Sequence, residues 1–176
     1  CRFPGSSNKE EFFDVLSTGE IMIKEKPVDR WIGKETRKDI GGWVEDTNLF
    51  DEAYFGINPK DAAVMDPQAR VVLEESLKAI YDAGYETSQI RGEKAGVFIG
   101  GRGHQSSDLE TILSANNPIL GMGNNYMASN ISRFFDFKGP CMVVDTACSS
   151  GITALMMADD ALRQGRINMA VVGAVS

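Results

Sequence analysis

The hydrophobic pattern of this chain alternates between short apolar runs and longer amphipathic segments. Gly96-Val-Phe-Ile-Gly100 is a short apolar run bounded by glycines, which predicts a buried β-strand. The apolar run that ends at Asp145 and the run Met169–Val175 predict two more strands, and residues 150–164 between them predict a helix. Strands that alternate with helices are typical of a mostly parallel α/β sheet covered by helices.

Capping signals predict further helices before the first of these strands. Asn58-Pro59 and Asp66-Pro67 each place a capping side chain before a proline at the first helical position, and Gly84 is a stop signal. For Asp66 we favour this capping role over a polar site. Ser7-Asn8 predicts an earlier helix, which should end at Gly19. We expect its buried face to consist of four apolar residues, Phe12, Phe13, Val15 and Leu16.

Residues 21–42 mix charges and glycines without a clear period, so they predict an irregular surface excursion. Trp31 and Trp43 are expected to anchor this excursion to the body of the protein, because large aromatic side chains are seldom left in water. A second amphipathic segment, residues 124–137, predicts a helix that Gly139-Pro140 ends.

Composition and charge exclude several classes of protein. The 176 residues are 43% hydrophobic and 24% charged, which is ordinary for one globular domain. The net charge of −7 and the lack of a basic stripe argue against a nucleic-acid partner. No apolar run approaches the ~20 residues of a membrane span, and no signal peptide is evident, so we expect a cytoplasmic protein. Three cysteines without a C-x-x-C pair, beside a single histidine, argue against disulfides or a zinc site.

Cys148 stands where an apolar run gives way to the predicted helix. A strand that turns sharply into a helix would place this thiol at the helix N-terminus, where unpaired N–H groups and the macrodipole stabilise an anion. The thiolate is the attacking form of cysteine, so Cys148 is a candidate nucleophile. The alternative is that Cys148 is a small core hydrophobe, as many free cysteines are.

Two other residues have possible roles beside Cys148. Cys141 lies seven residues earlier and either pairs with it in a redox reaction or packs in the core, and we favour core packing. His104 is the single histidine and either activates Cys148 as a base or is simply solvated in its loop, and we favour solvation.

The stretch Asp145-Thr-Ala-Cys-Ser-Ser150 resembles the active-site motif of β-ketoacyl synthases, especially the ketosynthase domains of modular polyketide synthases. The family's other motifs are matched in order by Cys1-Arg-Phe-Pro-Gly5, Tyr54-Phe-Gly-Ile-Asn-Pro59, Met65-Asp-Pro-Gln-Ala-Arg70, Gly96–Gly100 and Phe134-Phe-Asp-Phe-Lys-Gly-Pro140. Departures from the family's pattern occur at Ser129-Asn-Ile-Ser-Arg133 in place of "NRISY", at Gly151 and Ile152 in place of serine and leucine, and at Ala174 in place of a second glycine.

The resemblance implies the N-terminal half of a thiolase-like α/β fold, with residues 1–176 a fragment truncated at both ends and prone to aggregate alone. It also implies that an acyl chain is loaded onto Cys148, after which a malonyl-type extender is condensed with it by a decarboxylative Claisen reaction. No bound cofactor is expected, because the substrates are thioesters on the phosphopantetheine arm of an acyl carrier protein. Further expected partners are adjacent polyketide synthase domains and, at full length, a second copy in a homodimer.

Three other functions are alternatives to this interpretation of the sequence. A stand-alone fatty-acid condensing enzyme shares the Cys148 chemistry, although the Cys1–Gly5 and Met65–Arg70 motifs favour the multidomain type. A non-condensing structural or gating subunit would typically lack Cys148. A cysteine hydrolase would need a histidine in reach and has only His104. The family's two catalytic histidines lie downstream of residue 176, so the chain alone is expected to be inactive in condensation.

Overall fold

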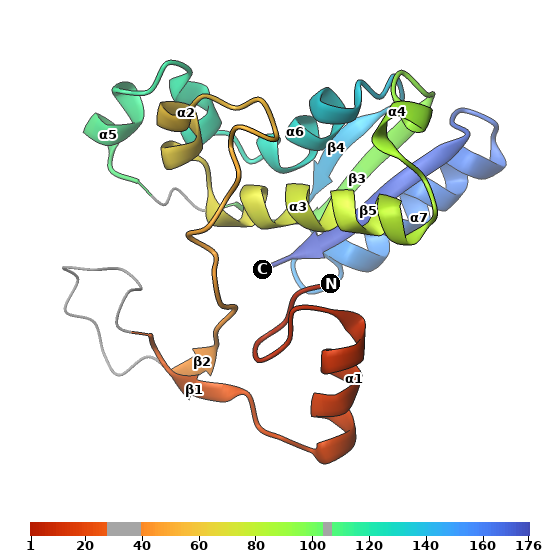
Figure 1. Cartoon of the computed structure of the whole chain (residues 1–176). Helices are drawn as coiled ribbons and strands as arrows, with labels where there is room; N and C mark the ends of the chain where they lie inside the picture. Colours follow the sequence, from red (N-terminus) through yellow and green to blue (C-terminus); the bar gives the residue numbers. More distant parts are fainter. Residues whose placement is uncertain (28–39, 104–106) are drawn as a thin grey trace. The chain divides into compact units, whose positions relative to one another are not determined.

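The computed structural model describes residues 1–27, 40–103 and 107–176. These residues form two compact units, an N-terminal unit (Cys1–Leu49) and a C-terminal unit (Phe50–Ser176) (Figure 1).

In the N-terminal unit, helix α1 (Lys9–Thr18) begins where the Asn8 side chain accepts a hydrogen bond from the Glu11 N–H at 2.9 Å. The helix ends at Gly19, whose φ of 68° is the left-handed conformation that glycine adopts freely. The predicted bounds are therefore confirmed. The predicted buried face is wrong, because no α1 residue is buried and Phe13 is 68% exposed.

The rest of the N-terminal unit contains a short antiparallel pair that the sequence pattern did not predict. Strand β1 (Ile23–Glu25) pairs with β2 (Ile40–Gly42). Trp43 links the end of this pair to its first strand, since its indole N–H donates to the Lys24 carbonyl at 3.2 Å. The expected anchoring of residues 21–42 to the body of the protein stays a prediction. The prediction for Trp31 lies outside the described residues.

The C-terminal unit is built on a three-stranded parallel sheet in the order β4-β3-β5. The strands are β3 (Ala95–Gly101), β4 (Cys141–Val144) and β5 (Met169–Val175), close to the three predicted runs. The helices of this unit are α2 (Pro59–Val64), α3 (Pro67–Asp82), α4 (Thr87–Ile90), α5 (Leu109–Leu113), the 3₁₀ helix η1 (Pro118–Gly121), α6 (Tyr126–Phe135) and α7 (Ser150–Arg163). The predicted caps are confirmed, because the side chains of Asn58 and Asp66 accept from the backbone at the starts of α2 and α3.

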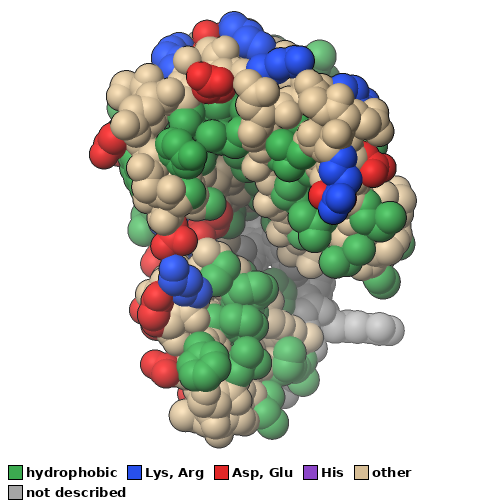
Figure 2. Space-filling view, turned by 90° about the vertical axis from the view of Figure 1, so that its right-hand side faces the viewer, with side chains coloured by type: hydrophobic (Ala, Val, Ile, Leu, Met, Phe, Trp, Pro, Cys, Tyr) green, Lys and Arg blue, Asp and Glu red, His purple; other side chains and the backbone are tan. Residues whose placement is uncertain are grey.

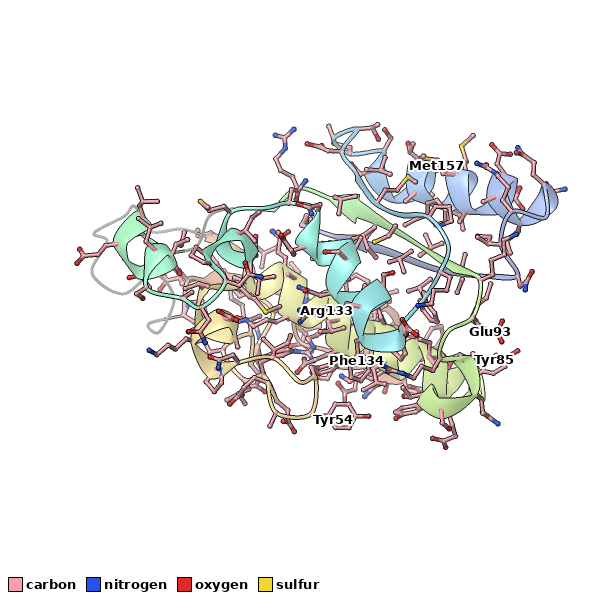
Figure 3. All side chains as sticks on the ribbon, turned by 90° about the horizontal axis from the view of Figure 1, so that it is seen from above. Tyr54, Tyr85, Glu93, Arg133, Phe134 and Met157 are labelled. Atoms are coloured by element: carbon pink, nitrogen blue, oxygen red, sulfur yellow. The ribbon has the colours of Figure 1, made fainter. Side chains whose placement is uncertain are left out.

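Helices cover both faces of this sheet. Helix α7 lies against one face, and α3 and α6 lie against the other (Figure 1). From above, Met157 on α7 and Phe134 on α6 lie on opposite sides of the strands (Figure 3). The C-terminal unit is therefore an α/β arrangement of three layers, as the sequence pattern predicts.

The side chains of β3 alternate between two hydrophobic clusters. Val97 and Ile99 pack in the cluster that includes α3 and α6, whereas Phe98 packs against α7. Every residue of β3 is buried, because a central strand with helices on both faces has no side open to water. On α7 the residues that meet the sheet are small, namely Ala154, Ala158 and Ala161, so the helix approaches the strands closely.

Some hydrophobic side chains remain at the surface of each unit, interspersed with charged ones (Figure 2). On α7 these are Ile152, Leu155, Met156, Met157 and Leu162, of which Ile152 is the most exposed at 65%. Within the described ranges, none of the helices has the length and apolar character needed to cross a membrane.

Candidate active site

Cys148 lies in the tight connection between β4 and α7. Residues 145–149 form this connection, which we call the Cys148 loop, and Ser149 is the N-cap of the helix. The predicted position of Cys148 at a strand–helix junction is thereby confirmed. The residue is exposed, so in the described structure it is not the small core hydrophobe of the alternative interpretation.

The backbone turns at Ala147, immediately before Cys148. Ala147 has a φ of 55°, a left-handed conformation that costs a non-glycine residue about 1–2 kcal/mol. Its N–H donates to Asp145 Oδ1 at 3.2 Å, and its carbonyl accepts from Ser150 Oγ at 2.6 Å and from the Ser150 N–H at 3.1 Å. Hydrogen bonds on both sides of Ala147 thus hold the strained turn in place.

Hydroxyl groups connect the Cys148 loop to the first turn of α7. Ser150 is only 6% exposed, and its Oγ also accepts from the Thr146 N–H at 2.9 Å. Ser149 Oγ donates to the Thr146 carbonyl at 2.9 Å, and the hydroxyls of Thr146 and Thr153 lie 3.1 Å apart. These contacts fix the direction in which the chain presents Cys148.

Small residues bring the start of α7 directly onto the end of the sheet. A Cβ placed on Gly100 would lie 2.5 Å from the backbone nitrogen of Gly151, so only glycine fits at this point of β3. A Cβ placed on Gly151 would in turn lie 2.8 Å from the Cβ of Ala174 on β5. Cys148 is therefore seated just above the carboxyl edge of the strands, where ligands of parallel α/β sheets commonly bind.

An ion pair joins this loop to the end of β3. Arg102 Nε donates to Asp145 Oδ2 at 2.7 Å, and the side chains are 67% and 30% exposed. The Arg102 guanidinium, and secondarily the Ala147 N–H, hold the pKa of the Asp145 carboxyl below its usual value. Sequence reasoning missed Arg102. The available signal was that residues directly after parallel strands meet at one edge of the sheet.

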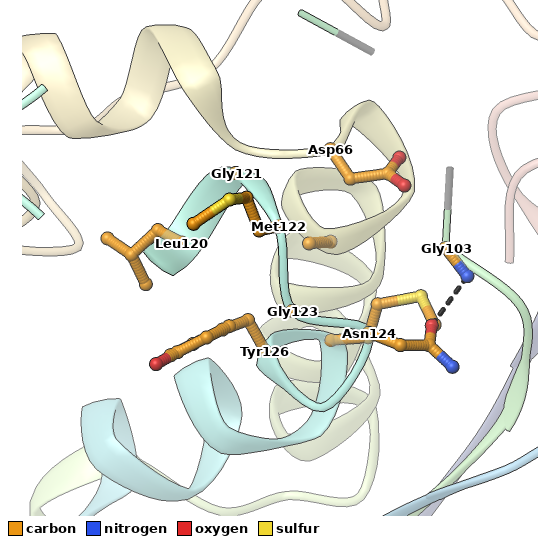
Figure 4. Close-up of a pocket in the computed structure, with 10 residues that line it drawn as sticks. Asp66, Gly103, Leu120, Gly121, Met122, Gly123, Asn124 and Tyr126 are labelled. Atoms are coloured by element: carbon orange, nitrogen blue, oxygen red, sulfur yellow. Dashed lines mark hydrogen bonds between the residues drawn. The ribbon is translucent and has the colours of Figure 1, made fainter. Parts of the chain in front are cut away.

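A cavity of about 70 Å³ lies beside the segment that follows β3 (Figure 4). At its rim the Gly103 N–H donates to Asn124 Oδ1 at 2.5 Å. Asp66 also borders the cavity, and its Oδ1 caps α3 by accepting from the Gln68 N–H at 2.8 Å, which confirms the predicted cap. The Gly103–Asn124 contact tethers the chain just beyond Arg102.

The two other candidate residues from the sequence are Cys141 and His104. Cys141 is exposed at the start of β4, so the core-packing prediction is wrong, because the strand begins at the surface before its side chains enter the clusters. Desolvation nevertheless raises the pKa of the Cys141 thiol, partly offset by the Ser132 hydroxyl. Neither Cys141 nor Cys148 is in a disulfide. The prediction for His104 lies outside the described residues.

The chain is similar over its whole length to a known protein family. The sequence profile of the N-terminal domain of β-ketoacyl synthases matches residues 1–176. This chain belongs to the β-ketoacyl synthase family. The motifs and the Cys148 loop described above are thus those of a member of this family.

Two curated relatives show the breadth of the match. Polyketide synthase PksL of Bacillus subtilis (strain 168) is 46% identical over 176 residues, which are 100% of this chain and 4% of that protein. Fatty acid synthase of Anser anser anser is 39% identical over 181 residues, covering 99% of this chain and 51% of that protein. The chain thus spans about half or less of these β-ketoacyl synthase relatives.

Solved structures establish the fold. The ketosynthase from module 6 of the bacillaene synthase of Bacillus subtilis 168 has a TM-score of 0.82 at 34% identity, covering 99% of this chain and 29% of that one. The oxazolomycin ketosynthase domain OzmH KS7 of Streptomyces albus JA3453 has a TM-score of 0.84 at 30% identity, covering 99% and 33%. The predicted thiolase-like fold of the ketosynthases is confirmed.

Proposed function

We propose that residues 1–176 form the N-terminal part of a ketosynthase domain and that Cys148 is its acyl-accepting nucleophile. The observation that carries this proposal is the position of Cys148. It is exposed, directly precedes the N-cap of α7, and follows a left-handed Ala147 whose geometry is held by hydrogen bonds. A strained, over-determined turn beside a candidate nucleophile favours a catalytic role.

The first stage is transfer of an acyl group from the phosphopantetheine thiol of an acyl carrier protein. Cys148 gives up its proton, its thiolate attacks the thioester carbonyl carbon, and a new C–S bond forms. The bond to the carrier sulfur breaks, and the departing carrier thiolate takes up a proton in place of the one that Cys148 released. One thioester replaces another, so the step is close to even in free energy. The N-terminus of α7 stabilises the thiolate, and the Cys148 N–H is one donor to the oxyanion of the tetrahedral intermediate.

The second stage joins this acyl group to a malonyl-type extender on a carrier protein. The extender loses carbon dioxide, its enolate carbon attacks the Cys148 thioester carbonyl, and the C–S bond breaks to return the thiolate. The histidines that stabilise the enolate in this family lie downstream of the cysteine. Condensation therefore requires the complete domain, which we expect to work as a homodimer beside the other domains of a polyketide synthase.

The test uses the complete domain, incubated with an acyl carrier protein that carries an acyl thioester and analysed by intact mass. We expect an adduct that maps to Cys148, which Cys148→Ala abolishes. Cys141→Ala is the matched control, because its thiol is also exposed, and it should still be acylated. Fast release of free acid would indicate a hydrolase. Loading without condensation when extender is added would indicate a non-condensing subunit.

A further inference from the structure

A chain of polar contacts connects Arg102 to the backbone beside Cys148. Arg102 Nε donates a hydrogen bond to Asp145 Oδ2 at 2.7 Å, and the other oxygen of the same carboxylate accepts one from the Ala147 N–H at 3.2 Å. Ala147 is the left-handed residue that directly precedes Cys148. One carboxylate therefore connects the end of β3 with the strained turn, and the guanidinium fixes the orientation of that carboxylate.

Among the described residues, few other charged groups lie on the elements around this pair. Strands β3, β4 and β5 contain no Asp, Glu, Lys or Arg, and the first nine residues of α7 contain none either. On α6 the only such residue is Arg133, in its last turn. The carboxylate of Asp66 faces the position next to Arg102, since its Oδ2 would lie 3.2 Å from a Cβ on Gly103. Asp145 and Arg102 thus dominate the charge next to the Cys148 loop.

We propose that Arg102 is a positioning residue for Cys148, which acts by holding the Asp145 carboxylate against the Ala147 N–H. The inference deepens the proposed acyl transfer and rests on Cys148 being its nucleophile. Arg102 does not contact the reacting atoms in this arrangement. It keeps the left-handed turn in the geometry that presents the thiol, and it neutralises an anion three residues before that thiol.

Loss of the guanidinium has two consequences. The carboxylate is free to rotate away from Ala147, which lets the turn relax and displaces the thiol, and small displacements at a reacting centre are costly in rate. The uncompensated anion also disfavours the thiolate, which moves the reactivity of the thiol to higher pH. Since Arg102 is largely exposed, the effect on stability is small, and the effect on reactivity distinguishes positioning from a merely structural role.

The experiment compares Arg102→Gln with Arg163→Gln in the complete domain. Arg163 is the matched control, because its Nε makes a similar exposed contact with Asp159 at 2.6 Å, far along α7 from the Cys148 loop. Two rates are measured, acylation of Cys148 by an acyl-pantetheine thioester and alkylation of Cys148 by iodoacetamide as a function of pH. We expect Arg102→Gln to slow acylation about tenfold and to move the alkylation profile to higher pH, and Arg163→Gln to change neither.

The pH range of the assay leaves the ion pair intact in the unmodified domain. The pKa of Asp145 lies below its ordinary value of about 4, so the contact is present above that value and is lost as the pH falls through the lowered one. A shift between pH 6 and 9 therefore reports on the thiol. Adding Asp145→Asn to Arg102→Gln removes the anion and should return the alkylation profile toward lower pH.

Equal acylation rates in Arg102→Gln and Arg163→Gln would overturn the inference. If Arg102→Gln unfolds, Asp145→Ala removes both acceptor oxygens from the other side of the contact, and an unchanged acylation rate in that variant would overturn it as well. If the unmodified domain is not acylated at all while the alkylation profile still shifts in Arg102→Gln, the positioning role stands and the proposed acyl transfer fails.

Discussion

The contact between Gly151 and Ala174 supports a test of how α7 is seated on the sheet. In Gly151→Ala the new Cβ would meet the Ala174 Cβ at 2.8 Å, whereas optimal carbon–carbon contacts lie at about 3.5–4.0 Å. The first turn of α7 cannot move aside on its other flank, because it already lies against Gly100. Overpacking of this kind costs about 1–3 kcal/mol. The better helix propensity of alanine offsets about 0.5–1 kcal/mol of this cost.

We therefore expect Gly151→Ala to lower the free energy of unfolding of the complete domain by about 1–2 kcal/mol. Ala174→Gly removes the opposing methyl group, so the double variant should recover at least about 1 kcal/mol relative to the sum of the single changes. Denaturant titration of the four proteins gives this coupling energy. Gly41→Ala is the control, since its Cβ would meet Trp43 at an ordinary 3.7 Å.

Single effects that add within about 0.5 kcal/mol would refute the reasoning, because residues in contact should couple. A coupling of the expected sign would also explain two departures from the family's pattern together. Gly151 replaces serine and Ala174 replaces glycine, so the side chain missing from the helix compensates for the methyl group added on the strand.

Two further predictions concern the Cys148 loop and its neighbour on β4. Ser150→Ala should lower the free energy of unfolding by about 1–3 kcal/mol and slow acylation of Cys148, because the Thr146 N–H and the Ala147 carbonyl both lose the Ser150 hydroxyl. Denaturant titration measures the first effect and mass spectrometry the second, and unchanged values would contradict the role of Ser150. Desolvation raises the pKa of the Cys141 thiol, so this thiol stays protonated at neutral pH and iodoacetamide should label it only as the pH rises. Peptide mapping after labelling across pH 6–10 checks this prediction, and rapid labelling of Cys141 at pH 7 would contradict it.

Several elements of the C-terminal unit were predictable because strong local signals agree with the tertiary structure. The glycine-bounded run of β3, the apolar run of β4 and the proline-marked starts of α2 and α3 each combine periodicity with a capping or turn signal. Cys148 itself was predictable from its place between an apolar run and a helix. The family motif around it then supplied the chemistry that position alone leaves open.

Features that depend on distant contacts were not predictable in this way. The sequence does not state that Arg102 meets Asp145, 43 residues away, because that contact depends on the parallel pairing of β3 with β4. The pair β1–β2 was missed because three-residue strands carry almost no periodicity. The apolar face predicted for α1 failed because hydrophobic spacing indicates a face without showing what covers it, and within the described residues Phe13 remains exposed.

The complete burial of β3 has a consequence for how the C-terminal unit fluctuates. The backbone of β3 is hydrogen-bonded to a strand on each side and covered by helices on both faces. Its amide hydrogens should therefore be the last in this unit to exchange with deuterated water. The first turn of α7, which directly follows the Cys148 loop, rests on Gly100 near the end of this strand. The slowest-opening part of the unit thus lies directly beneath the residue on which the proposed chemistry depends.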